Sequence, residues 1–220
     1  MRVLLVGTGT DVGKTHVTCA LGAYAPRSVA AYKPIATGCD RRCEDAERHA
    51  EALGAPYVPP TFGYRRPISP HLAARDEGRP IELAPIVTCA ASLEREVEVL
   101  LVESAGGLFS PLDDTRTVAD LARELAPDVL LLVAPDRIGV LHDVRATLLA
   151  ARGTSLPKPL LVLSAPPEPD ASTGCNAAEL ERLGLGPVLA VFPRAPIRDE
   201  TTADAARRVW VGLGVGTPNP

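Results

Sequence analysis

Short apolar runs recur along the chain and are separated by segments of a different periodicity. Runs of four to six residues consist mainly of Val, Leu and Ala, which is typical of strands buried on both faces of a parallel sheet. They predict six strands, at Val3–Val6, Val29–Tyr32, Val97–Val102, Val129–Val133, Leu160–Leu163 and Val188–Phe192.

Between these runs, apolar residues recur every three or four positions, which indicates amphipathic helices. The predicted helices are Gly13–Tyr24, Asp45–Leu53, Leu83–Glu96, Val118–Leu125, Val140–Ala151, Ala177–Leu183 and Thr202–Val211. Because strands and helices alternate, we expect a parallel sheet covered by helices on both faces, with ligands bound at the carboxyl ends of the strands.

The length of 220 residues fits one α/β domain, which we place at residues 1–213. The tail 214–220 is expected to be frayed. The longest irregular stretch, Pro56–Pro70, is rich in Pro and Gly, and loops of that length tend to be functional.

A glycine-rich segment connects the first strand to the first helix. It reads Gly7-Thr8-Gly9-Thr10-Asp11-Val12-Gly13-Lys14-Thr15 and is one residue longer than the usual phosphate-binding P-loop. Such a loop turns backbone N–H groups toward an anion at the positive end of a helix. Lys14 would meet the β- and γ-phosphates and Thr15 a Mg²⁺ ion. The sequence therefore predicts an α/β domain of the P-loop NTPase type that binds a nucleoside triphosphate.

Lysine is rare in this chain, which has 23 Lys and Arg residues but lysine only at positions 14, 33 and 158. Lys33 ends the second predicted strand and precedes Pro34 and Thr37, so it would point into the crevice that holds the nucleotide. A cation there would stabilise charge during phosphoryl transfer. A surface lysine in a turn is the alternative, but the P-loop beside it favours the site.

Two carboxylates stand at the ends of predicted elements. Glu103 closes the third apolar strand and precedes Ser104-Ala105-Gly106-Gly107, an arrangement suited to binding Mg²⁺ directly or through water. Asp45 begins the second helix, where N-capping and Mg²⁺ binding are both open readings. Asp11, inside the P-loop, could face metal or solvent.

Overall charge and composition narrow the remaining function classes. A net charge of −4 argues against a nucleic-acid-binding surface. The chain has no apolar run of about 20 residues that would span a membrane, and it begins with a strand rather than a signal peptide. We therefore expect a cytoplasmic protein with its five cysteines reduced. A metal site at Cys39, Cys43 and His49 is the alternative, although no fourth ligand is evident.

Taken in this order, the motifs resemble the dethiobiotin synthetase family over nearly the whole chain. The resemblance rests on four parts of the chain. They are the P-loop, Tyr32-Lys33-Pro34-Ile35-Ala36-Thr37-Gly38, Ile68-Ser69-Pro70-His71 with Glu77-Gly78-Arg79-Pro80-Ile81, and Val102-Glu103-Ser104-Ala105-Gly106-Gly107-Leu108. The resemblance implies that ATP, CO₂ and 7,8-diaminopelargonate give dethiobiotin, ADP and phosphate. The diamine would capture CO₂ as a carbamate, and the carbamate would become a carbamic–phosphoric anhydride. The second amine would then close the ring.

The resemblance also assigns roles to individual residues. Lys33, Lys14 and Thr10 would act in catalysis, and Thr15, Asp45 and Glu103 would hold Mg²⁺. The family is a homodimer in which a helix start from the other subunit helps to hold the substrate carboxylate. The implied substrate contacts are Thr37, Ile138, Gly139, Val140 and Leu141. The implied nucleotide contacts are Asp11, Val12, Gly13, Lys14, Thr15, His16, Asp45, Glu103, Ser104, Ala105, Gly106, Ser164, Ala165, Phe192, Pro193 and Arg194.

The chain departs from the family in two places. Many members read adenine with an Asn-Asp pair, where this chain has Ser164-Ala165-Pro166-Pro167. One hydroxyl cannot reproduce the paired donor and acceptor of an amide, so we expect weak discrimination among nucleoside triphosphates. Ser104 replaces a usual glycine, which matters only if its φ angle is positive.

Three alternative functions would also use a P-loop. A partner-regulating ATPase of the partitioning type would carry a lysine five residues before Lys14, where this chain has Gly9. An amidoligase related to cobyrinic acid synthesis would usually need a glutaminase domain, for which there is no room. A non-enzymatic nucleotide-binding module would leave Lys33 and Thr37 unexplained.

Overall fold

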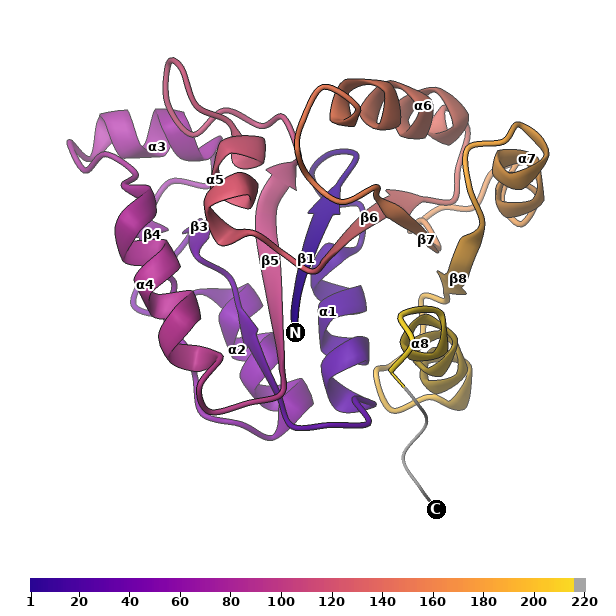
Figure 1. The fold of residues 1–220 in the computed structure, drawn as a ribbon, viewed down its shortest axis with the longest axis horizontal. Helices are drawn as coiled ribbons and strands as arrows, with labels where there is room; N and C mark the ends of the chain where they lie inside the picture. Colours follow the sequence, from indigo (N-terminus) through magenta and orange to yellow (C-terminus); the bar gives the residue numbers. More distant parts are fainter. Residues whose placement is uncertain (216–220) are drawn as a thin grey trace.

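The computed structural model describes residues 1–215 and contains a parallel sheet between two layers of helices (Figure 1). The six strands are β1 (Arg2–Gly7), β2 (Val29–Tyr32), β5 (Val99–Gly107), β6 (Val129–Pro135), β7 (Leu160–Ser164) and β8 (Val188–Phe192), in the order β2-β5-β1-β6-β7-β8. All adjacent pairs are parallel. The predicted fold class is confirmed.

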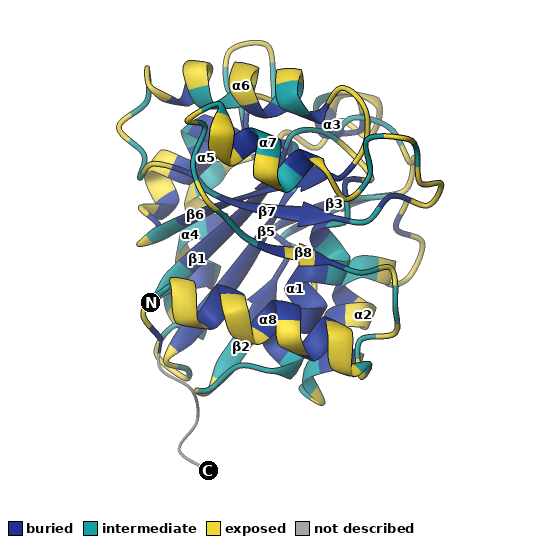
Figure 2. Ribbon diagram, turned by 90° about the vertical axis from the view of Figure 1, so that its right-hand side faces the viewer, coloured by how far each residue is buried: buried dark blue, intermediate teal, exposed yellow. Residues whose placement is uncertain are grey.

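The sheet is covered on both faces, as the strand–helix alternation predicts (Figure 2). One face packs against α1 (Lys14–Ala23) and α8 (Glu200–Gly212), with α2 (Glu44–Leu53) beside α1. The other packs against α3 (Pro70–Asp76), α4 (Leu83–Leu93), α5 (Val118–Leu125), α6 (Val140–Ala151) and α7 (Asn176–Arg182). Side chains alternate along β1: Leu4 and Val6 enter one core and Val3 and Leu5 the other.

Three elements were not predicted from the sequence. β3 (Ile35–Thr37) and β4 (Phe62–Tyr64) form a separate two-stranded parallel sheet, and β4 lies within the stretch predicted to be irregular. The third is α3, a helix of seven residues that has Pro70 in its first turn. Each is too short for a repeating hydrophobic pattern to develop.

One further expectation about the chain needs correction. Cys39 and Cys43 form a disulfide, so the expectation of five reduced cysteines is wrong for this pair. The frayed tail at 214–220 stays a prediction, and at its start Val215 is buried and its N–H donates to the carbonyl of Trp210 at 3.0 Å. The rest of the predicted tail, residues 216–220, lies outside the described residues.

Among the described residues, no helix combines the length and the apolar character that crossing a membrane requires.

Candidate active site

The glycine-rich segment forms a tight loop between β1 and α1. Gly13 has φ +91° and is the N-cap of α1, a backbone conformation that favours glycine. Lys14 is buried, and its ammonium donates to the carbonyl of Gly9 at 2.9 Å. Burial lowers the pKa of Lys14 to about 8, because removal from water disfavours the charged form. The loop thus holds the Lys14 ammonium against its own backbone, and a bound phosphate would supply a negatively charged partner for it.

Three oxygen-bearing side chains meet at the start of α1. The Thr15 hydroxyl lies 2.9 Å from Asp45 Oδ1 and 2.8 Å from Glu103 Oε1. The N-cap of α2 is Cys43, so Asp45 stands inside the first turn and N-capping does not account for it. Carboxylate and hydroxyl oxygens are the ligands that Mg²⁺ prefers. The donor set therefore fits Mg²⁺, although among the described residues no group of three His, Cys, Asp or Glu side chains has the arrangement of a metal site.

Glu103 is fully buried inside β5, which continues to Gly107 rather than ending before Glu103 as predicted. β5 lies next to β1, which brings Glu103 close to the P-loop. Burial alone would raise the pKa of Glu103, but Lys33 and His49 outweigh it, and the pKa lies well below its usual value. Glu103 is therefore a permanent buried anion at neutral pH.

Lys33 stands directly after β2 and points its ammonium at this anion. Its Nζ lies 2.8 Å from Glu103 Oε1 and also forms an ion pair with Asp45. Burial alone would lower the pKa of Lys33, but Glu103 and Asp45 outweigh it and hold the pKa above its usual value. The surface-lysine alternative is excluded, since Lys33 is only 8% exposed.

His49 joins the same cluster, which the sequence did not lead us to expect. Its Nε2 lies 2.8 Å from Glu103 Oε2, and its ring is buried on the inner face of α2. The alternative of a metal site at Cys39, Cys43 and His49 is wrong, because the two cysteines are bonded to each other. The signal that could have found this contact is the spacing of four residues between Asp45 and His49, which places both side chains on one helix face.

A cavity of about 700 Å³ adjoins the P-loop. Predicted positions that line it are Thr10, Asp11, Val12, Gly13, His16, Ser164, Ala165, Pro193 and Arg194. Phe192 contacts His16 edge to face, with ring centroids 6.4 Å apart. Arg48 and Arg137 also line the cavity and were not predicted. The volume is that of a ligand pocket for a molecule of nucleotide size.

The remaining predicted residues lie at neighbouring strand and helix ends. Ser104 is not among the residues with positive φ, so its replacement of glycine carries no backbone strain. Its hydroxyl donates to the carbonyl of Gly106 at 3.1 Å. Thr37 ends β3, outside the lining of the P-loop cavity.

The segment Ile138–Leu141 forms the start of α6, with Gly139 as N-cap at φ +93°. The N–H of Ile138 donates to Asp170 Oδ2 at 2.8 Å, which ties this turn to the loop after β7. Ile138 is 76% exposed.

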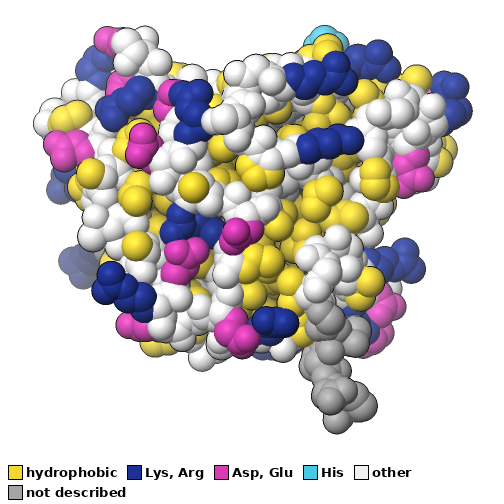
Figure 3. Space-filling view, viewed as in Figure 1, with side chains coloured by type: hydrophobic (Ala, Val, Ile, Leu, Met, Phe, Trp, Pro, Cys, Tyr) yellow, Lys and Arg dark blue, Asp and Glu magenta, His cyan; other side chains and the backbone are white. Residues whose placement is uncertain are grey.

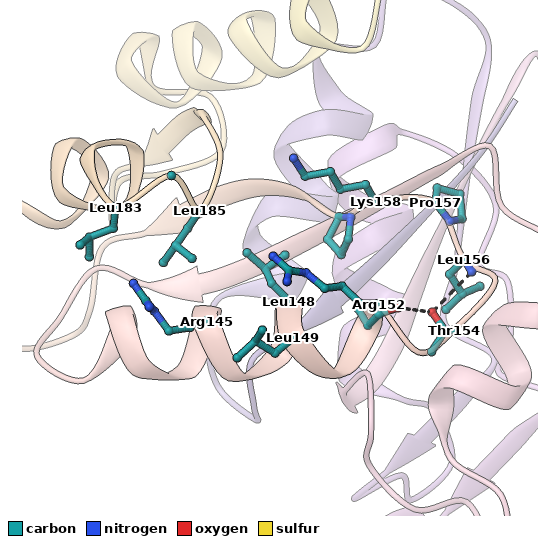
Figure 4. Close-up of a pocket in the computed structure, with 13 residues that line it drawn as sticks. Arg145, Leu148, Leu149, Arg152, Thr154, Leu156, Pro157, Lys158, Leu183 and Leu185 are labelled. Atoms are coloured by element: carbon teal, nitrogen blue, oxygen red, sulfur yellow. Dashed lines mark hydrogen bonds between the residues drawn. The ribbon is translucent and has the colours of Figure 1, made fainter.

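A second cavity, of about 600 Å³, lies between the end of α6 and the turn that follows α7 (Figure 4). Arg145, Arg152 and Lys158 surround leucine side chains there, and basic side chains are visible near α6 in Figure 3. None of the predicted site residues lines this cavity.

Comparisons with known proteins agree on the type of fold. The family model described as AAA domain matches residues 1–202. The solved structure of the cell division ATPase MinD from Pyrococcus furiosus superimposes with a TM-score of 0.58 at 17% identity, covering 97% of this chain and 98% of that one. At that identity the likeness concerns the fold alone.

Sequence relatives among curated proteins are more informative. The ATP-dependent dethiobiotin synthetase BioD of Saccharopolyspora erythraea is 37% identical over 221 residues, covering 98% of both chains. The protein of the same name from Anaeromyxobacter dehalogenans (strain 2CP-C) is 39% identical over 219 residues, covering 94% of both chains.

Proposed function

The chain belongs to the ATP-dependent dethiobiotin synthetase family, and we propose that it forms dethiobiotin from 7,8-diaminopelargonate, CO₂ and ATP. The observation that carries this proposal is the cluster beside the P-loop, in which the Thr15 hydroxyl and the Lys33 ammonium each lie 2.8 Å from Glu103 Oε1. A reaction between two anions, a carbamate and a triphosphate, requires such an arrangement of cations and metal ligands.

The proposed reaction proceeds in three steps. One amine of the diamine adds to CO₂ and loses a proton, which gives a carbamate. A carbamate oxygen then attacks the γ-phosphorus, and the bond from that phosphorus to the β-phosphate oxygen breaks to release ADP. Finally the second amine attacks the carbamoyl carbon, loses a proton and expels phosphate, which closes the ureido ring.

The residues of the loop and strands divide the work of binding and charge neutralisation. Backbone N–H groups from Gly13 to Thr15 would hold the phosphates at the start of α1. Lys14 would leave the carbonyl of Gly9 for the β- and γ-phosphates. Lys33 would stand between the carbamate and the γ-phosphate. Thr10 would contact the diamine.

Mg²⁺, held by Thr15, Asp45 and Glu103, would neutralise phosphate charge. In the structure, the Lys33 ammonium bridges Asp45 and Glu103. We propose that ligand binding frees Lys33 from at least one of these carboxylates, because a second cation at the same oxygens weakens its hold.

The nucleoside is proposed to occupy the cavity of about 700 Å³, between Ser164-Ala165 and Pro193-Arg194. His16, Asp11 and Val12 would border it from the P-loop side.

The substrate site is proposed to include Thr37 and, from a second copy of the chain, Ile138–Leu141. The support is the exposed Ile138 side chain next to the N-terminus of α6, where helix-end N–H groups can bind a carboxylate. An Ile138→Asp variant should weaken dimerisation and raise KM for the diamine. Light scattering during gel filtration would test the first effect and initial rates the second.

A phosphate-release assay tests the function. ATP, Mg²⁺, bicarbonate and diamine are each omitted in turn, and ¹³C-bicarbonate identifies the product carbon by mass spectrometry. Phosphate release should require both the diamine and bicarbonate, and the label should appear in dethiobiotin. Lys33→Ala should abolish release, while Lys158→Ala, at an exposed lysine outside the cluster, should leave it unchanged. ATP turnover that is indifferent to the diamine would instead favour a partner-regulated ATPase.

A further inference from the structure

His49 is a polar side chain where the surrounding helix face is apolar. The buried residues of α2 are Ala46, His49 and Ala52, and His49 is 2% exposed. Its Nδ1 is buried and has no hydrogen-bond partner among the described residues. The ring therefore makes one hydrogen bond, through Nε2, and Nδ1 stays unsatisfied. An unsatisfied buried nitrogen opposes folding. A packing role alone would be filled better by an apolar side chain.

Among the described residues, the one side-chain hydrogen bond of His49 fixes a carboxylate. Its Nε2 lies 2.8 Å from Oε2 of Glu103, whereas Oε1 accepts the Thr15 hydroxyl and the Lys33 ammonium. Each oxygen of Glu103 thus has its own partners, with His49 at Oε2 and with Thr15 and Lys33 at Oε1. Since Oε2 accepts from His49, rotation of the carboxylate about its last torsion would break that hydrogen bond. Oε1 is therefore held toward Thr15.

We infer that His49 is a positioning residue, which orients Glu103 so that Oε1 faces the cation site formed with Thr15 and Asp45. This inference rests on the proposed function only in assuming a Mg²⁺–nucleotide complex at that site. His49 does not touch the substrates and acts through Glu103. Removal of a hydrogen bond to the outer oxygen of a metal-ligating carboxylate typically weakens metal binding or activity about 10- to 100-fold.

Three substitutions separate positioning from packing. His49→Gln places an amide N–H near the position of Nε2, His49→Asn carries the same amide one methylene shorter, and His49→Leu removes the donor while keeping bulk. Each variant is studied as the full chain. The probes are Mg²⁺ and ADP, so that binding is measured whether or not the protein turns over the diamine.

Binding and thermal stability provide readouts besides activity. Isothermal titration measures the Mg²⁺ concentration that gives half of the maximal enhancement of ADP binding. This concentration should rise at least about tenfold in His49→Leu and His49→Asn, but less than about threefold in His49→Gln. ADP affinity without Mg²⁺ should be the same in all four proteins. The gain in Tm on adding Mg²⁺ to the ADP complex should follow the same order.

Either of two results would overturn the inference: an unchanged Mg²⁺ requirement in His49→Leu, or equal requirements in His49→Gln and His49→Asn. If His49→Leu does not fold, the Gln and Asn pair alone decides. Failure of the proposed function is recognised separately, because it appears as loss of the diamine requirement in the wild-type protein, with Mg²⁺–ADP binding intact.

Discussion

Lys33 and Glu103 form a buried ion pair across two neighbouring strands, with Nζ 2.8 Å from Oε1. Lys33 follows the last residue of β2, and Glu103 lies inside β5, one residue beyond the partner of Tyr32. The pair forms because parallel strands bring their carboxyl ends to one edge of the sheet. The same edge carries the P-loop, so the ion pair and the phosphate site are one structural unit.

Removal of the Lys33 charge should destabilise the protein as well as inactivate it. Lys33→Met leaves the Glu103 carboxylate buried with one partner fewer, and such a loss typically costs about 3–5 kcal/mol. The free energy of unfolding from urea titrations measures this. The double variant Lys33→Met/Glu103→Gln should recover much of the stability, because neither member of this buried pair is then charged, while phosphate release stays absent. A double variant no more stable than Lys33→Met would contradict this account.

Gly13 should tolerate no side chain, unlike Gly9 in the same loop. A Cβ at Gly13 would lie 2.2 Å from Ser164 Oγ, and φ is +91°. Apart from its chain neighbours, the one described heavy atom within 4 Å of a Cβ at Gly9 would be Val12 Cγ1, at 3.9 Å. Gly13→Ala should therefore weaken ATP binding at least about tenfold, or about 1.4 kcal/mol, with Gly9→Ala much closer to wild type. Fluorescent-nucleotide titration provides the comparison, and equal losses in the two variants would show that space around Gly13 is not the cause.

The sequence was sufficient to predict the sheet and most of the side chains that meet beside the P-loop in the candidate site. Buried parallel strands have continuous apolar runs, and the spacing of Gly13, Lys14 and Thr15 after such a run is characteristic of a phosphate-binding loop. Lys33 and Glu103 were predicted because each comes directly after an apolar strand pattern, and the carboxyl ends of such strands form the ligand-binding edge of the sheet. These residues carry local signals that tertiary contacts did not override.

Features that depend on contacts between distant segments had weaker local signals. β3 pairs with β4 across more than twenty residues, and three-residue strands show no period. Cys39 and Cys43 were expected to be reduced, with a metal site as the alternative, and only their three-dimensional placement reveals the disulfide. The sequence associates His49 with those nearby cysteines, whereas its partner Glu103 is 54 residues away.

Nucleotide preference should be broad. The cavity wall at Ala165, Pro166, Pro167 and Pro193 offers few side-chain hydrogen bonds, and proline lacks a backbone N–H. Ser164 supplies a hydroxyl, but it lies against Gly13 of the phosphate loop. A site built to hydrogen-bond a substrate group can reject its analogue by about 10⁴-fold, so we expect less than about a hundredfold difference between ATP and CTP. Ratios of kcat/KM for the two nucleotides decide this, and a larger preference for ATP would refute it.

Four of the five cysteines should fall into three classes of reactivity. Cys175 is exposed and should be alkylated in the native protein, while Cys39 and Cys43 should react only after reduction of their disulfide. Cys19 is buried, and burial, with a smaller contribution from Glu103, raises the pKa of its thiol to about 12. Since the thiolate is the nucleophile, Cys19 should stay unmodified at pH 8.

The raised pKa of Cys19 also fixes the sign of a stability effect. The unfolded chain releases this proton near the ordinary thiol pKa of 9.0 and the folded protein near 12, so the contribution is complete below pH 9 and is lost as the pH rises toward 12. Cys19→Ala should therefore show a shallower fall in the free energy of unfolding between pH 9 and 11 than Cys175→Ala, the matched exposed control. Peptide mapping after iodoacetamide treatment assigns the labelled thiols. Modification of Cys19 at pH 8 with the fold intact, or identical pH profiles for the two variants, would show that its environment is more open than the packing of α1 implies.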